Sequence, residues 1–393
     1  MSFATFLHRA VCSALLALTI DSGILSSAQS PGGAGRDTPA GNFDTIRQRA
    51  DEARTGGRLQ EAIELYGRAV RLRPAWVEGH WYLGTSCYEI EKFADCRDAF
   101  RRVVRLQSEN GAAWAFKGLC EFRLKNYSVA LGDLNKAQGL GVGDPKLIPV
   151  ARYHRAILLT RFEHYERALQ AYAEFAREGN ASPMIVEGMG IAVLRLAFLP
   201  DEVPAETRDV VALAGRASVL AASNKMDAAQ KDFEELVRRY PRTPNVHYLY
   251  GVYLLRDYPD QALEAFNEEL EVSPNHARAM LQIAQEMLKR GEVEAALRWA
   301  TQAVRIAPRN FVGRRTLGQI LLERSDVPGA IAELEAAVKL EPDSPSVHYA
   351  LARAYQRAGR ATDAKRERAA FSRLERLQQE QRGGANAVGG TPK

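Results

Sequence analysis

Cysteine is scarce in this chain: only four occur among 393 residues, at positions 12, 87, 96 and 120. Four cysteines cannot form the disulfide framework of a small secreted domain, and none of their spacings is the CxxC of a zinc or redox site. The chain also lacks an excess of charge, because 53 basic residues face 48 acidic ones and leave a net charge of +5. This balance gives no electrostatic sign of a dedicated nucleic-acid-binding protein.

Motifs of catalytic and cofactor sites are also missing from the sequence. We find no HExxH metal helix, no phosphate-binding loop, no GxSxG nucleophile turn and no Rossmann glycine pattern. The paired carboxylates Glu234-Glu235 and Glu268-Glu269 fall on segments whose solvent faces are expected to be charged. The histidines at positions 80, 247 and 348 share one position of the repeat described below, so we interpret them as structural. We therefore predict no metal site, no cofactor and no enzymatic activity.

Residues 1–28 have the layout of a cleaved secretory signal peptide. A basic residue precedes a short apolar stretch over residues 10–20, and Ser26 and Ala28 provide the small side chains that signal peptidase requires. The apolar stretch is too short to cross roughly 30 Å of hydrocarbon, for which about 20 residues are needed. The alternatives are an uncleaved anchor and a buried helix. The preferred interpretation predicts an exported protein that is periplasmic, held in the cell envelope or secreted.

A period of about 34 residues organises the rest of the chain. Its most regular part is an alanine, then an apolar residue four positions later, another three positions after that, and often a proline. A second group of apolar residues and glycines precedes several of these alanines, as in Trp81-Tyr82-Leu83-Gly84. Nine anchors carry the first pattern: Ala62, Cys96, Ala130, Ala168, Ala229, Ala262, Ala296, Ala330 and Ala364.

These residues resemble the tetratricopeptide repeat, a helix-turn-helix unit of about 34 residues with the signature W-x2-L-G-x2-Y, A-x3-F and P. The resemblance extends over residues 43–376 and implies an all-α fold. The implied architecture is a right-handed α-solenoid of about nine helix-turn-helix repeats with one helical insertion in the middle of the array. The chain is most similar to secreted bacterial tetratricopeptide proteins, which implies binding of protein segments and implies no reaction.

The prediction divides the chain into six segments. They are a signal peptide (1–28), a flexible linker (29–42), the N-terminal half of the array (43–181), an insertion (182–209), the C-terminal half with a capping helix (210–378) and a disordered tail (379–393). Gly57, Gly291 and Gly359 are expected in the turns between paired helices, where glycine adopts a left-handed conformation at little cost.

The insertion is inferred from one long interval, because the step from Ala168 to Ala229 is nearly two periods of the repeat. Residues 184–198 are predicted to form an apolar helix without a partner helix of its own. We expect this helix to pack across the array. The alternative is an apolar contact for a partner, made by the residues Met184, Met189 and Leu194.

Three cysteines remain after the predicted cleavage. Cys87 and Cys96 could form a disulfide, because the repeat register places them on the facing helices of one hairpin. The preferred interpretation is that both are small, buried packing residues. Cys120 is predicted to lie in the core.

The resemblance implies that the first helix of each repeat lines a concave surface. The position after the Trp or His of each first helix, and the position eight residues later, are expected to face a partner. Aromatic and arginine side chains carry much of the binding energy at protein interfaces. They recur at these positions as Trp81, Tyr153, Tyr248, Tyr349, Arg123, Arg161, Arg256 and Arg357. The alternative is that the aromatic rings pack between helices and the arginines are solvated.

We therefore predict an exported, non-enzymatic scaffold that binds a protein or an extended peptide on the concave face of the solenoid. Nucleic acid is not an expected partner, and no integral membrane segment is expected after signal cleavage. A second hypothesis is a subunit of an envelope assembly or secretion complex attached through residues 184–198. A third is an accessory protein to a glycan- or peptide-processing enzyme, which no residue supports.

Overall fold

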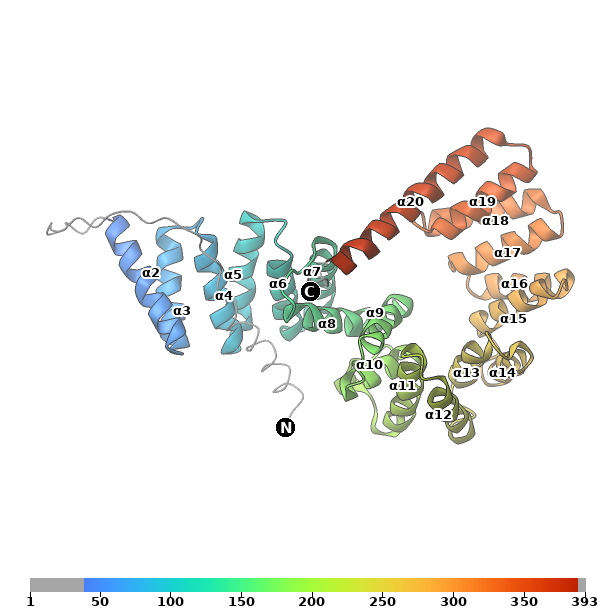
Figure 1. Cartoon of the computed structure of the whole chain (residues 1–393), viewed down its shortest axis with the longest axis horizontal. Coiled ribbons are helices and arrows are strands. Elements are labelled where there is room, and N and C mark those ends of the chain that lie inside the picture. Colours follow the sequence, from blue (N-terminus) through green and yellow to red (C-terminus); the bar gives the residue numbers. More distant parts are fainter. Residues whose placement is uncertain (1–38, 388–393) are drawn as a thin grey trace, which may run out of the picture. The chain divides into compact units, whose positions relative to one another are not determined.

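The computed structural model consists of α-helices in antiparallel pairs connected by short turns (Figure 1). It describes residues 39–387, with side chains for residues 42–379. No strand occurs within the described residues, which confirms the all-α prediction. The predicted signal peptide and most of the predicted linker lie outside this range. The chain divides into two compact units, Met1–Ala229 and Gln230–Lys393, and each is described by itself.

The first unit is formed by ten α-helices and two short 3-10 helices within the described residues. The first six helices are α2 (Pro39–Thr55), α3 (Leu59–Leu72), α4 (Val77–Glu89), α5 (Phe93–Leu106), α6 (Gly111–Arg123) and α7 (Tyr127–Leu140). They are followed by α8 (Leu147–Arg161), α9 (Tyr165–Arg177), α10 (Pro183–Val193), η1 (Pro200–Glu202), η2 (Ala205–Thr207) and α11 (Arg208–Ala222).

Helix α12 (Met226–Arg239) contains the division between the units. The second unit continues with α13 (Val246–Leu254), α14 (Pro259–Val272), α15 (Ala277–Lys289), α16 (Val293–Ile306), α17 (Phe311–Glu323), α18 (Val327–Leu340), α19 (Pro345–Arg357) and α20 (Ala361–Ala387). Within each unit consecutive helices pair, from α2 with α3 to α10 with α11 in the first unit and from α13 with α14 to α19 with α20 in the second. The structure agrees with the predicted array of about nine repeats, although the predicted anchor Ala229 lies on α12, outside these pairs.

The small residues of the repeat pattern allow the two helices of a hairpin to approach closely. None of the nine anchors exposes more than 2% of its surface. A Cβ atom on Gly84 would lie 2.7 Å from the ring of Phe100, which is closer than van der Waals contact. The same approach recurs between Gly251 and Phe266 and between Gly318 and Leu334. The signature glycines are therefore required by helix packing.

The turn inside most hairpins contains one residue with positive φ, and the α13–α14 turn is an exception. The predicted turn glycines Gly57, Gly291 and Gly359 have φ of 73°, 81° and 72°. Other hairpins place a residue with a side chain at the same position, including Ser325 with φ of 68°. Left-handed backbone is unfavourable for such residues, so the packing of the surrounding helices determines this turn.

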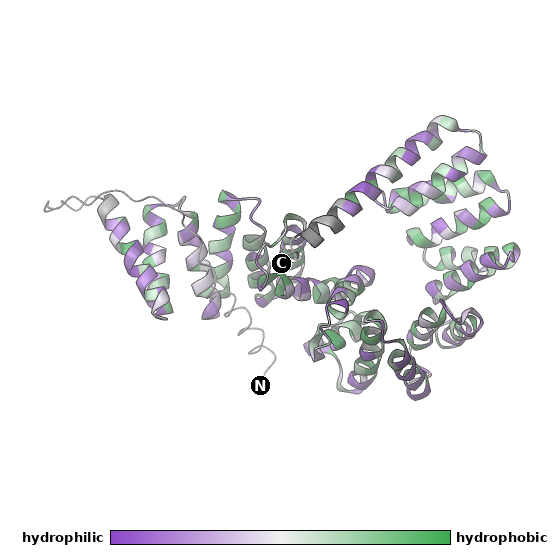
Figure 2. Ribbon diagram, viewed as in Figure 1, coloured by the Kyte–Doolittle hydropathy of each residue, from purple (hydrophilic) through white to green (hydrophobic). Residues whose placement is uncertain are grey.

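Helix α20 is longer than the other helices and mostly polar (Figure 2). Only its first half has a partner of matching length, because α19 is 13 residues long and α20 is 27. It continues to Ala387, into the segment 379–393 that was predicted to be disordered. Residues 379–382 are glutamine, glutamate and arginine, which favour helices, and two glycines, which do not, follow at 383 and 384.

The insertion differs from its prediction. Helix α10 is largely apolar (Figure 2) and ends at Val193, because Arg195 adopts a φ of 56°. It packs along α11 in the way that the two helices of each other hairpin pack. A Cβ atom on Gly190 would lie 1.9 Å from the carbonyl oxygen of Val211. The prediction of an apolar helix without a partner is therefore wrong, because glycines permit a close crossing with α11.

The cysteines also differ from their prediction. A disulfide joins Cys96 of α5 to Cys120 of α6, whose Cα atoms are 6.4 Å apart. Cys87 of α4 is a buried free thiol. Cys96 lies on the side of α5 that contacts α6, whereas Cys87 faces a groove between α3 and α5. The Cys87–Cys96 pairing is therefore wrong, and so is the prediction that Cys96 and Cys120 are packing residues only.

None of the helices between residues 39 and 387 combines the length and the apolar character needed to cross a membrane.

Candidate partner-binding surfaces

The first helices of the hairpins in the second unit present three rows of side chains at equivalent repeat positions. Neighbouring rows are one turn apart, because residues four positions apart lie on one face of a helix. The first row is Tyr248, Leu281, Arg315 and Tyr349, the second is Val252, Gln285, Gln319 and Arg353, and the third is Arg256, Lys289, Glu323 and Arg357. We call these three rows the first-helix face.

Exposure increases from the first row to the third. Leu281 is buried, and Tyr248 and Arg315 are half-buried. In the second row, Val252 exposes 40% of its surface and the two glutamines are half-buried. Every residue of the third row is exposed. The accessible part of the face therefore consists of the second and third rows together with Tyr349.

The charged residues of this face already form ion pairs within the chain. The guanidinium groups of Arg353 and Arg357 lie 3.6 Å and 3.7 Å from the same carboxylate oxygen of Glu323. Arg256 pairs with the neighbouring Asp257 at 2.8 Å, and both side chains are exposed. Exposed pairs of this kind stabilise a fold by about 0–1 kcal/mol each. Carboxylates of a partner can therefore replace these intramolecular acceptors at little cost.

The four aromatic residues predicted to contact a partner have different environments. Trp81 is half-buried, and its ring meets the ring of Phe100 edge-on at 5.3 Å. Tyr153 is 2% exposed, and half-buried Tyr248 packs against neighbouring aromatic rings. Tyr349 is 51% exposed. The alternative of packing between helices therefore describes Trp81, Tyr153 and Tyr248, and Tyr349 alone of the four presents a large free surface.

The predicted arginines all reach the surface, but three of them are held by neighbouring elements. Arg123 lies 3.3 Å from the carboxylate of Glu91 in the preceding hairpin. Arg161 donates a hydrogen bond of 2.8 Å to the carbonyl oxygen of Ala197. Arg357 donates a hydrogen bond to the carbonyl oxygen of Leu322 on α17. Arg256 and Arg357 belong to the third row of the first-helix face.

The predicted apolar contact on the insertion is mostly buried. Met189 and Leu194 lie in the core, and Met184 is half-buried. The assignment of Met189 and Leu194 as contact residues is therefore wrong, because the pairing of α10 with α11 covers them. Met184, Leu196 and Phe198 are half-buried, so part of residues 184–198 stays accessible at the surface.

Sequence reasoning missed the second row of the first-helix face. Its residues Val252, Gln285, Gln319 and Arg353 stand four positions after the row that was predicted to face a partner. The signal was available, since helical periodicity places these residues between the two predicted rows. Most of the predicted first row is buried or half-buried instead, and only Tyr349 of that row is exposed.

In the first unit, the residues equivalent to the second row are not accessible to a partner. The residues corresponding to the second row there are Thr85, Leu119 and Ile157, and all three are buried. A partner therefore finds no comparable row on α4, α6 and α8.

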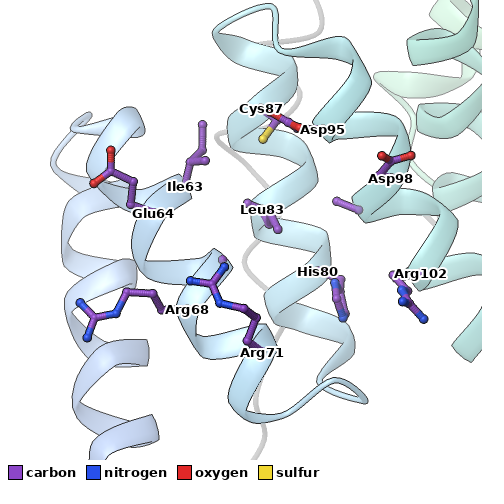
Figure 3. Close-up of a pocket in the computed structure, with 12 residues that line it drawn as sticks. Ile63, Glu64, Arg68, Arg71, His80, Leu83, Cys87, Asp95, Asp98 and Arg102 are labelled. Carbon is purple, nitrogen blue, oxygen red and sulfur yellow. The ribbon is translucent and has the colours of Figure 1, made fainter.

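The first unit instead has a groove between α3 and α5, with α4 as its floor (Figure 3). Its volume is about 680 Å³. Apolar side chains form the middle of the floor, including Leu83 and Cys87. Figure 3 shows basic residues at one end of the groove, Arg68, Arg71, His80 and Arg102, and acidic residues toward the other, Glu64, Asp95 and Asp98. We call this feature the α3–α5 groove.

Burial shifts the pKa values of two titratable groups on the floor of the α3–α5 groove, Cys87 and His80. It raises the pKa of the Cys87 thiol to about 12, so this cysteine is protonated and unreactive at neutral pH. Burial also lowers the pKa of His80, and the charge of Arg102 acts in the same direction. His80 is therefore neutral at neutral pH. These groups provide neither a nucleophile nor a charged acid.

The three histidines that share a repeat position have the same structural role. In each case Nε2 is within hydrogen-bond distance of the carbonyl oxygen of a proline six residues earlier, and the pairs are His80–Pro74 (3.0 Å), His247–Pro241 (2.8 Å) and His348–Pro342 (2.8 Å). This bond fastens the loop between two hairpins to the next first helix. Across residues 39–387, no three His, Cys, Asp or Glu residues are grouped so that they could hold a metal ion.

Comparisons with known proteins agree with the observed hairpins. A family model described as "Tetratricopeptide repeat" matches residues 47–95, 83–145, 215–258 and 256–311. A second, described as "TPR repeat", matches residues 318–359. Together the matched residues make up more than half of the chain.

Solved structures similar to the chain include two of the protein MamA. One, from Desulfovibrio magneticus RS-1, is 23% identical and covers 43% of this chain and 96% of that one, with a TM-score of 0.38. A second MamA structure is 14% identical over 42% of this chain and 96% of that one, with a TM-score of 0.37. A chain of the APC/C hetero-tetramer Cut9-Hcn1 is 12% identical over 89% of this chain and 91% of that one, with a TM-score of 0.41.

Proposed function

Because the chain belongs to the tetratricopeptide-repeat family, we propose that it is an exported, non-enzymatic scaffold that binds a protein or an extended peptide. The observation that carries this proposal is the first-helix face of the second unit, where four successive first helices present accessible residues in register. Arrays of repeats suit such a function because each repeat contacts only its neighbours and leaves long surfaces open. The near-neutral net charge favours a protein partner over nucleic acid.

The spacing of the rows suggests how a segment would bind. Neighbouring packed helices are about 10 Å apart, and an extended chain advances about 3.3 Å per residue. Each first helix would therefore meet about every third residue of a segment that crosses the face. The amides of Gln285 and Gln319 lie midway along the second row and can both donate and accept hydrogen bonds to a peptide backbone. Val252 and Tyr349 add apolar contacts near the two ends.

The proposal of export combines two observations. Residues 1–28 have the sequence of a cleaved signal peptide. The disulfide between Cys96 and Cys120 supports the proposal, since such bonds persist in oxidising compartments and are rare in the cytosol. Mass spectrometry of the chain from its native cells should find an N-terminus near Gln29. A full-length chain with reduced cysteines would contradict export.

Site-specific photo-crosslinking in the native cells tests the binding surface. A photoreactive amino acid at Gln319 should capture a discrete partner, because this position lies in the middle of the second row. The same amino acid at Thr301, which is exposed on the second helix α16, provides the matched control. The double variant Val252→Glu and Arg353→Glu should abolish the adduct while the helical content of the chain is unchanged. An adduct that is equal at both positions, or that survives the double variant, would contradict the assignment.

A further inference from the structure

The histidine at the shared repeat position has a carboxylate neighbour in two repeats and none in the third. The Nδ1 atom of His247 lies 2.9 Å from Glu268, and that of His348 lies 2.7 Å from Glu367. No carboxylate within the described residues lies at ion-pair distance from Nδ1 of His80, whose Nε2 meets the carbonyl oxygen of Pro74. Arg102 occupies the repeat position of Glu268, because each stands six residues after its anchor. The α3–α5 groove therefore lacks a carboxylate that related sites possess.

Three arginines surround this position without an acidic partner. Arg68 and Arg71 lie one turn apart on α3, and Arg102 faces them from α5 (Figure 3). No carboxylate within the described part of the chain forms an ion pair with any of the three. The guanidinium of Arg71 lies over Gly67, since a Cβ atom added there would be 3.8 Å from its Nη1 atom. Because Gly67 has no side chain, there is room for an anionic group beside Arg71.

The acidic residues toward the other end of the groove do not neutralise these arginines. Asp98 already pairs with two arginines of its own helix, Arg97 at 2.9 Å and Arg101 at 2.8 Å. Glu64 and Asp95 form no ion pair with a basic residue of the described chain. The groove therefore has free positive charge at one end, an apolar floor in the middle and free negative charge at the other end.

The next hairpin has a different residue at the position of His80. Trp114 takes the position of His80 there, and its indole Nε1 donates a hydrogen bond of 2.8 Å to the carbonyl oxygen of Ser108. Lys117 lies 5.4 Å from the indole ring. A larger ring therefore fills the space that the smaller His80 leaves free.

We propose that the α3–α5 groove binds an extended acidic segment of a partner protein. A carboxylate of the segment takes the place that Glu268 occupies beside His247, and so lies between His80 and the arginines. An apolar side chain of the segment covers Leu83, and a basic residue reaches Glu64 and Asp95. The groove is made by helices other than those of the first-helix face, so this proposal stands or fails independently of the proposed function.

Fluorescence anisotropy with the purified chain and short synthetic peptides tests the proposal. The probe is a fluorescein-labelled peptide with paired glutamates at one end, leucine in the middle and lysine at the other end, made in both chain directions. We expect saturable binding that weakens as salt is added. Replacing the glutamates by glutamines should weaken binding by about tenfold or more, because hydrogen bonds between charged groups are the stronger ones. A phosphoserine peptide that binds when the glutamate peptide does not would overturn the assignment to a carboxylate.

Two variants with the same charge change separate the site from general electrostatics. Arg102→Glu places a carboxylate beside His80 from within the chain, as Glu268 does at His247. It should weaken binding of the glutamate peptide by about tenfold or more without lowering the midpoint of unfolding. Lys136→Glu makes the same change at the equivalent, exposed position of the next hairpin and should leave binding within about twofold. No saturable binding by the unmodified chain, or equal effects of the two variants, would overturn the proposal.

Discussion

The crossing of α10 and α11 depends on two glycines, and replacing either with alanine should destabilise the protein. A Cβ atom on Gly190 would lie 1.9 Å from the carbonyl oxygen of Val211, and one on Gly215 would lie 1.9 Å from that of Val186. Ordinary van der Waals contact begins at 3.4 Å, so the helices must move apart before either methyl group fits. Both opposing atoms belong to the backbone, and a change of rotamer cannot relieve the contact.

The expected magnitude follows from two opposing effects. Overpacking a well-packed core costs about 1–3 kcal/mol, occasionally more. Alanine recovers about 1 kcal/mol, because glycine is a poor residue inside a helix. A backbone contact this short requires the upper part of the range, so we expect Gly190→Ala to lower the free energy of unfolding by about 2 kcal/mol. The double variant with Gly215→Ala should cost less than the sum, because one separation of the helices accommodates both methyl groups.

Urea denaturation followed by circular dichroism at the helical band measures this effect. Gly132→Ala is the matched control, because Gly132 is exposed in the middle of α7 and a Cβ atom there would have no neighbour within 4 Å. It should raise the midpoint of unfolding, with a gain of up to about 1 kcal/mol. The two substitutions are chemically identical and should have opposite signs. Equal stabilisation by both would refute the close crossing of α10 and α11.

Three further predictions concern a buried histidine, the disulfide and one turn residue. Burial lowers the pKa of His154 to about 4, so the folded chain binds fewer protons than the unfolded chain between about pH 6.5 and 4. Neutral His154 therefore contributes up to about 3 kcal/mol to the free energy of unfolding above about pH 6.5, and this contribution is lost as pH falls through the window. In a plot of the free energy of unfolding against pH, His154→Gln should flatten this part of the curve. Peptide mapping without reductant should find Cys96 linked to Cys120. Reduction should lower the free energy of unfolding by about 3.5 kcal/mol on a chain-entropy estimate, given a separation of 24 residues, and an unchanged midpoint would contradict the bond. Ser325→Gly should stabilise the chain by about 1 kcal/mol, because glycine adopts its φ of 68° freely, and a loss of stability in the same assay would show that the serine side chain contributes there.

The repeat could be predicted because it depends on contacts between residues close in sequence. Anchors such as Ala62 and glycines such as Gly84 are spaced by the geometry of two crossing helices, and that geometry recurs with every copy. The turn at Gly57 was predictable for the same reason, since positive φ strongly favours one residue type. The shared position of the histidines also indicated a structural role.

The features that were not predicted depend on the direction in which a side chain points between repeats. Spacing alone placed Cys87 and Cys96 on one hairpin, but it did not show that Cys96 faces α6 and Cys87 faces the groove between α3 and α5. It also placed Tyr153 in a row with Tyr349, although one ring is buried and the other is exposed. The pairing of α10 with α11 could not be predicted, because α11 also matches the repeat pattern of the following hairpin.

The disulfide of the first unit has a mechanical consequence. Cys96 and Cys120 lie 24 residues apart, on helices of consecutive hairpins. When the chain is stretched from its ends, tension passes across the sulfur atoms and bypasses the residues between them. A fully extended chain gains at most about 3.3–3.6 Å per residue, so the oxidised protein should be roughly 80 Å shorter at full extension than the reduced one. The junction between the second and third hairpins is therefore the part of the first unit that a pulling force cannot draw out.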